Sequence, residues 1–88
     1  MIMKVVKQDE TIKVDSKKPE GGKVDLCRIH LQEFGNQYED TYIATMIGKT
    51  ATCRFMPGQI VAAKLRFQAR EYNGQMYQDT TVVEIAKL

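Results

Sequence analysis

The chain of 88 residues is long enough to bury one modest hydrophobic core, so a single domain over residues 1–88 is predicted. Hydrophobic residues make up 43% and charged residues 27% of the sequence, and no apolar run approaches the roughly 18 residues of a membrane span. The composition therefore argues against a disordered chain and against membrane insertion. The net charge of +2 does not by itself indicate a partner.

The N-terminal segment and the cysteines indicate where the protein works. Charges appear early in the first ten residues, which lack the apolar core of a signal peptide, so a cytoplasmic protein is predicted. Cys27 and Cys53 form no CxxC motif and the chain has a single histidine, which favours neither a zinc site nor a disulfide. We expect two reduced, partly buried thiols and no metal or other cofactor.

The first strand and the loop after it are marked by a change of composition. Met3, Val5, Ile12 and Val14 are spaced by two but are interrupted at residues 8–10, which predicts one strand with a bend or bulge. The polar segment that follows, with Lys17 and Lys18 in it, is rich in residues that end regular structure, and it is predicted to be a mobile loop over residues 15–22.

The second and third strands are predicted over residues 23–33 and 38–47, with a turn at residues 34–37 between them. In the second strand, apolar residues alternate with polar ones, as in a half-buried strand. In the third strand both alternating sets contain apolar residues, and the isoleucines favour an inward set of Thr41, Ile43, Thr45 and Ile47. In the second strand the inward set is Cys27, Ile29 and Leu31, and the outward set is Arg28, His30 and Gln32.

A short connector precedes the fourth strand. Residues 48–55 lack strand alternation, which predicts a short helix or an irregular crossover. Met56-Pro57-Gly58 is a turn sequence, because proline fixes φ and glycine adopts positive φ at little cost. The fourth strand is predicted to begin at Gln59 or Ile60.

The last two strands form a long hairpin around Asn73-Gly74, the dipeptide that a type I′ turn requires. Alternation along the first of these strands predicts a core face and a solvent face. The core face is Val61, Ala63, Leu65, Phe67 and Ala69, and the solvent face is Lys64, Arg66, Gln68, Arg70 and Tyr72. The turn predicts the pairs Tyr72–Gln75, Arg70–Tyr77, Gln68–Asp79, Arg66–Thr81 and Leu65–Val82.

Five strands with a long final hairpin indicate an all-β fold. A polar loop after the first strand and at most one short helix between strands three and four match the five-stranded Greek-key barrel called the OB-fold. An open antiparallel sheet and an SH3-like barrel are the alternatives.

The segment REYNGQMYQD resembles the hairpin of a family of small bacterial OB-fold proteins of unknown function. The resemblance covers about the last third of the chain, and Met76 stands where that family has tryptophan. It implies an OB-fold and the binding of single-stranded DNA, by the similarity of that family to other OB-folds. The matching residues are Arg70, Glu71, Tyr72, Asn73, Gly74, Tyr77 and Asp79.

The candidate site combines basic and aromatic side chains on strand faces. Between Thr41 and Arg70 there are five bases and no acids, which predicts one positive surface. Proteins that bind single strands pair such a surface with rings on which bases stack. Lys17, Lys18 and Lys23 lie among acids in or beside the first loop, so their charge nearly cancels. The predicted nucleic-acid-binding residues are Arg28, Tyr42, Lys64, Arg66, Arg70, Tyr72 and Tyr77.

Two functional classes follow from this sequence. The first is a module that binds single-stranded DNA or RNA, and the alternative is a protein-interaction or assembly module that uses a sheet edge or the C-terminal hairpin. An enzyme is not expected, because no phosphate-binding glycine loop, metal-ligand cluster or catalytic triad pattern is present. We expect a homo-oligomer, since linked sites raise the affinity of a small ligand face.

Overall fold

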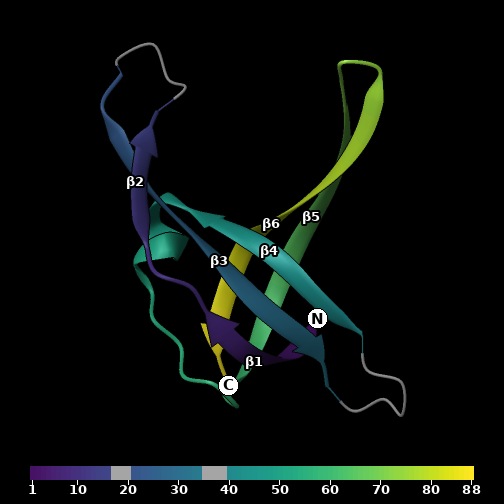
Figure 1. The fold of residues 1–88 in the computed structure, drawn as a ribbon. Coiled ribbons are helices and arrows are strands. Elements are labelled where there is room, and N and C mark those ends of the chain that lie inside the picture. The colour runs from purple at the N-terminus through teal and green to yellow at the C-terminus, as the bar shows by residue number, and fades with distance from the viewer. Residues whose placement is uncertain (17–20, 35–39) are drawn as a thin grey trace.

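The computed structural model describes residues 1–16, 21–34 and 40–88, and within them the protein is all-β (Figure 1). One 3-10 helix is the only helical element of the described part. The elements are β1 (Ile2–Gln8), β2 (Ile12–Asp15), β3 (Lys23–Glu33), β4 (Thr41–Ile47), the 3-10 helix η1 (Gly48–Thr52), β5 (Ile60–Tyr72) and β6 (Gln75–Lys87).

The six strands form one sheet in the order β1-β5-β6-β4-β3-β2, and β1 also pairs with β3. This additional pairing closes the sheet into a ring, which excludes the open antiparallel alternative. The strand pairs are antiparallel except for β4 and β6, which are parallel and meet at Thr45 and Thr81. This short parallel contact joins the N-terminal strands to the C-terminal hairpin.

The core fills the ring with side chains from five strands, from η1 and from the segment after η1. Met3, Ile29, Leu31 and Met46 are among its largest fully buried side chains. Each comes from a strand in which every second residue points inward. The complete buried set is Met3, Val5, Cys27, Ile29, Leu31, Ala44, Met46, Ala51, Phe55, Val61, Ala63 and Val82.

The first predicted strand is divided into β1 and β2, and the register shifts between Val5 and Lys7, as the interrupted alternation indicated. Both segments pair with β3, β1 along its second half and β2 along its first half. The division adds a strand to the five that the sequence predicts.

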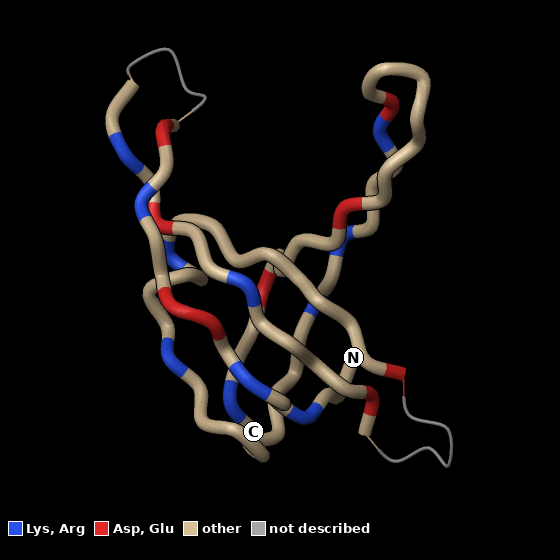
Figure 2. Tube along the Cα trace, in the orientation of Figure 1, with Lys and Arg blue, Asp and Glu red and all other residues tan. Residues whose placement is uncertain are grey.

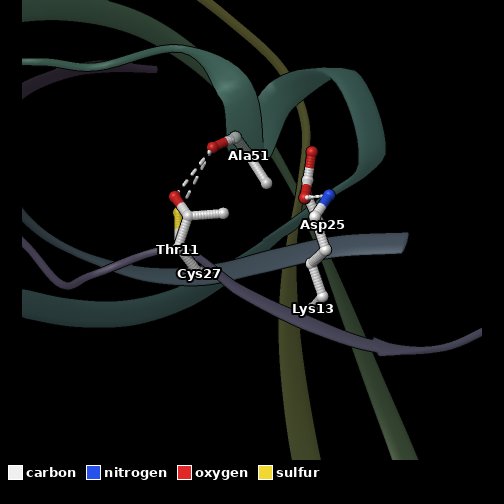
Figure 3. A network of polar contacts seen from close by, with 5 residues as sticks. All are labelled: Thr11, Lys13, Asp25, Cys27 and Ala51. Atoms are coloured by element: carbon white, nitrogen blue, oxygen red, sulfur yellow. Dashed lines mark hydrogen bonds and ion pairs between the residues drawn. The ribbon is translucent and has the colours of Figure 1, made fainter. Parts of the chain in front are cut away.

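The break between β1 and β2 is held by side chains that reach η1 and the segment after it. Gln8 donates from Nε2 to the Cys53 carbonyl at 2.8 Å, and its Oε1 accepts from the Phe55 N–H at 2.9 Å. Thr11 Oγ1 donates to the Ala51 carbonyl at 3.2 Å (Figure 3). The Gln8 amide thus bonds the backbone of residues 53–55 much as a neighbouring strand would.

The orientation predicted for β4 is wrong. Ala44 and Met46 are buried, whereas Ile43 and Ile47 are 56% and 47% exposed. The cause is the register with β3, in which Ala44 lies opposite the buried Ile29, and directly opposed residues share one face of a sheet. The isoleucines therefore lie on the outside of the ring.

The register predicted for the C-terminal hairpin is confirmed at all five pairs. Asn73 and Gly74 have φ of 51° and 77°, as the turn requires. The predicted core face is correct only up to Leu65. Phe67 is 46% exposed and Ala69 is also exposed, because the hairpin leaves the ring at about this point (Figure 1).

The β5–β6 hairpin contains a bulge close to the point where it leaves the ring. Lys64 pairs with Glu84 and Leu65 with Val82, so Val83 has no partner on β5. A bulge of this kind bends the strand and increases its twist. Residues 61–66 and 81–87 of the hairpin form a ring half, which is joined to β1 and β4, and the part between them, toward the turn, forms an arm that projects from the ring (Figure 1).

The connectors agree with the prediction where they are described. The short helix is η1, and β5 begins at Ile60. The turn predicted at residues 34–37 and the loop at residues 15–22 lie partly outside the described residues. Cys27 is buried and Cys53 is exposed, so the expectation of partial burial was wrong for Cys53. No helix in the described ranges is long and apolar enough to cross a membrane.

Candidate nucleic-acid interface

Four residues on neighbouring strands form a basic row across the outer face, the side of the sheet that points away from the core. Arg28 on β3 pairs with Thr45 on β4, Thr45 pairs with Thr81 on β6, and Thr81 pairs with Arg66 on β5. Strands lie about 4.8 Å apart, so the row spans roughly 14 Å from one arginine to the other. Two cations thus flank two hydroxyl side chains, the groups that proteins commonly present to phosphates.

The cations of this face are available to a ligand. Arg28, Lys64 and Arg66 are exposed, and within the described ranges none of the three takes part in an ion pair. Lys64 lies on the same side of β5 as Arg66, two residues before it. Glu84 is its cross-strand neighbour. Lys64, Arg66 and Arg70, three of the five bases between Thr41 and Arg70, therefore share one face of β5, with Glu84 beside Lys64, whereas Lys49 and Arg54 lie on η1 and the segment after it.

A second row, the aliphatic row, runs parallel to the basic row. It consists of Ile12, Leu26 and Ile47, which are paired across β2, β3 and β4. Ile12 is 54% exposed and Ile47 is 47% exposed. Exposed aliphatic side chains beside the basic row give the outer face an apolar strip next to a polar one.

Two hairpin arms rise from the same side of the ring, one formed by β2 and β3 and the other by β5 and β6 (Figure 1). Basic and acidic residues lie close together on both arms (Figure 2). On the first arm Lys13 contacts Asp25 at 2.8 Å, and Lys23 contacts Asp15 (Figure 3 shows the former pair). Charge on this arm is thus neutralised locally, as expected for Lys23, whereas residues 17 and 18 lie outside the described ranges.

Arg70 on the second arm is held in place by two neighbours. Its Nε lies 2.6 Å from an Asp79 carboxylate oxygen, and its guanidinium lies 5.3 Å from the centre of the Tyr77 ring. The contact with Tyr77 was predicted from the hairpin register. Because Asp79 offsets its charge, Arg70 adds less positive charge to this face than Arg66 does.

The tyrosines of the second arm are accessible. Tyr72 is 61% exposed and Tyr77 is 41% exposed, and the Tyr77 hydroxyl donates to Gln75 at 2.7 Å. Both lie on the face that also carries Arg66 and Arg70. These rings are the available stacking surfaces on this arm.

Tyr42 is misplaced in the predicted site. It pairs with the buried Leu31, so it lies on the inner side of β4 and not beside Arg28. Its ring meets Phe67 edge-on at 6.2 Å, and its hydroxyl donates to Glu33 at 3.3 Å. Partial burial, and then the Glu33 carboxylate, raise the pKa of Tyr42 above its ordinary value. Tyr42 therefore packs against Phe67 of the β5–β6 hairpin.

The threonines of the basic row and the members of the aliphatic row were not predicted as site residues. The threonines meet only through the parallel contact between β4 and β6, for which a single sequence carries no signal. The aliphatic row was not predicted because Ile47 of β4 was expected to point inward. In the described part of the chain, no group of histidine, cysteine, aspartate and glutamate residues is arranged to hold a metal ion.

Comparison with known proteins does not assign this chain to a family. No family model, no curated protein and no solved structure matches the chain. The resemblance of the C-terminal hairpin to the small bacterial family therefore stays a prediction.

Proposed function

We propose that this protein is a non-catalytic module that binds single-stranded nucleic acid across the outer face of β3, β4, β6 and β5. The observation that carries the proposal is the basic row, in which Arg28 and Arg66 flank Thr45 and Thr81 on four adjacent strands. The two arms border this face.

The proposal includes an OB-fold for the ring. If β1 and β2 are counted as one bent strand, the chain has five strands, and β3 and β4 are the second and third. In OB-folds the face of strands two and three and the loops 1–2 and 4–5 bind oligonucleotides. By this count the two arms carry those loops, and Arg28 lies on that face.

On this surface, the phosphate and the base of a nucleotide contact different side chains. The arginines of the basic row meet phosphates, and the aliphatic row and the exposed Tyr72 and Tyr77 contact bases. Stacking on an aromatic side chain contributes about 1–3 kcal/mol per base in other single-strand binding proteins. With two such rings and no tryptophan, phosphate contacts supply a large share of the affinity, which makes binding strongly dependent on salt.

The test compares two variants that remove one positive charge each from the same hairpin. Arg66→Ala removes a cation of the basic row. Lys87→Ala removes an exposed cation at the C-terminal end of β6, outside the basic row. Fluorescence anisotropy with a labelled mixed-sequence DNA of about 15 nucleotides, a length within the range of OB-fold sites, measures affinity over a salt series.

We expect Arg66→Ala to weaken binding and to reduce the slope of log K against log salt by about 0.7, the value for one phosphate contact to a single strand. Lys87→Ala is expected to leave the slope nearly unchanged. Equal effects of the two variants would locate binding elsewhere, and no binding by the wild-type protein at low salt would refute the proposal.

A second candidate function is assembly through the β5–β6 arm. Tyr72, Met76 and Phe67 are 61%, 67% and 46% exposed on this arm, where β5 and β6 pair with each other and, among the described residues, with no other strand. Assembly by apolar contacts predicts a homo-oligomer whose mass, measured by light scattering, changes little with salt. A monomer at micromolar concentration would contradict this candidate.

A further inference from the structure

A small hollow opens where the basic row and the aliphatic row begin on β2 and β3. Its volume is about 210 Å³. Pockets for drug-sized ligands are usually about 300–1,000 Å³, so this hollow suits a ligand group no larger than one base. It is lined by Asp9, Glu10, Ile12, Leu26, Cys27 and Arg28.

The lining offers three kinds of surface to a flat heterocycle. Ile12 and Leu26 supply apolar contact, Arg28 supplies donors, and the carboxylates of Asp9 and Glu10 supply acceptors. The Asp9 carboxylate already faces two side-chain nitrogens, His30 Nε2 at 3.5 Å and Lys7 Nζ at 3.9 Å.

Glu10 is the available acceptor of the hollow. It is exposed, and within residues 1–16, 21–34 and 40–88 its carboxylate enters no ion pair. A carboxylate repels phosphate and accepts hydrogen bonds from N–H groups. The part of a nucleotide that enters this hollow is therefore the base, while its phosphate stays near Arg28.

We propose that the hollow holds one base that carries an exocyclic amino group, and that Glu10 accepts a hydrogen bond from that group. This inference rests on the proposed function and assigns it a base preference. Cytosine and uracil make the comparison direct, because they share a ring and differ only at N3, which carries a proton in uracil alone, and at position 4. Cytosine presents an amino donor there, whereas a carbonyl oxygen at that position faces the carboxylate with no proton to share.

The experiment measures the affinity for dC and dU homopolymers of about 15 nucleotides by anisotropy at two salt concentrations. Deoxyuridine is used in place of thymidine so that no methyl group enters the comparison. We expect dC to bind at least about fivefold more tightly than dU, the lower end of the discrimination that a good base contact gives. Both should lose affinity as salt rises.

Glu10→Gln tests the residue, because an amide keeps the shape but also donates to a carbonyl oxygen. We expect the ratio of the dC to the dU affinity to fall toward one in this variant. Glu71→Gln, the same change of charge on the β5–β6 arm, should leave the ratio unchanged.

The possible results separate the two proposals. Equal, salt-sensitive binding of dC and dU by the wild-type protein would overturn the base preference and leave the proposed function standing. A preference for dU, or a dC preference that Glu10→Gln leaves intact, would also overturn the assignment to this hollow. If neither homopolymer nor the mixed sequence bound at low salt, both proposals would be refuted.

Discussion

The two halves of the β5–β6 hairpin have the same kind of sequence and opposite surroundings. In the ring half, Val61, Ala63 and Val82 are buried by the neighbouring strands. In the arm half, the same alternation continues through Phe67 and Ala69, yet both are exposed. Alternation thus indicates a strand with two different faces, but only neighbouring strands bury one of them.

Because of this difference, substitutions in the ring are expected to change stability more than substitutions on the arm. Side chains in the ring are packed against several others, so their loss leaves a cavity. Side chains on the arm contact mainly their own hairpin, and their replacement costs little folding free energy. A protein with this division can present different residues on its arms without losing its core.

The largest expected effect compares a core residue of the ring with an apolar residue of the arm. Ile29→Ala is expected to lower the free energy of unfolding by about 2–5 kcal/mol, because Ile29 is fully buried. Phe67→Ala should cost under about 2 kcal/mol, well below the usual value for a buried phenylalanine. Urea unfolding followed by circular dichroism measures both, and equal losses would show that the arm is as tightly packed as the ring.

An intermediate effect is expected from the side chain that replaces a strand contact. Gln8→Ala removes the bonds to the backbone of residues 53 and 55 and is expected to cost about 1–3 kcal/mol, because the partly buried Phe55 N–H loses its partner. Gln68→Ala, an exposed glutamine of the arm, is the matched control and should cost under about 0.5 kcal/mol. If the two variants unfold at the same urea concentration, the Gln8 contacts contribute nothing to stability.

Much of the fold is predictable from local signals. The Asn73-Gly74 turn fixes the register of the hairpin, and the alternation in β3 correctly predicts that Cys27, Ile29 and Leu31 point inward. The orientation of β4 is not predictable in the same way, because both of its alternating sets are apolar. There, the pairing with β3 decides that Ala44 and not Ile43 enters the ring.

The candidate site is predictable in its members and not in its arrangement. Arg28 and Arg66 each lie on the polar side of an alternating strand, which predicts their exposure, and both are exposed on the outer face. That they belong to one row follows from the parallel contact between Thr45 and Thr81, which joins distant parts of the chain. Tyr42 was assigned to the wrong face by the same error that misplaced Ile43.

The smallest expected effect concerns pH and again compares the two regions. The pKa of Tyr42 is raised in the folded protein by partial burial and by Glu33, so folding favours its neutral form. Its contribution to stability is complete below the ordinary tyrosine pKa of about 10 and is lost as the pH rises through the higher folded value.

Wild-type protein should therefore lose more stability than Tyr42→Phe between pH 8 and pH 11, the range around the ordinary tyrosine pKa of about 10. Tyr72→Phe, which removes the same hydroxyl group from a tyrosine that is 61% exposed on the arm, is the matched control. Urea midpoints at the two pH values measure the difference. A Tyr42→Phe curve parallel to the wild-type curve would mean that contact with Glu33 and Phe67 does not couple this tyrosine to folding.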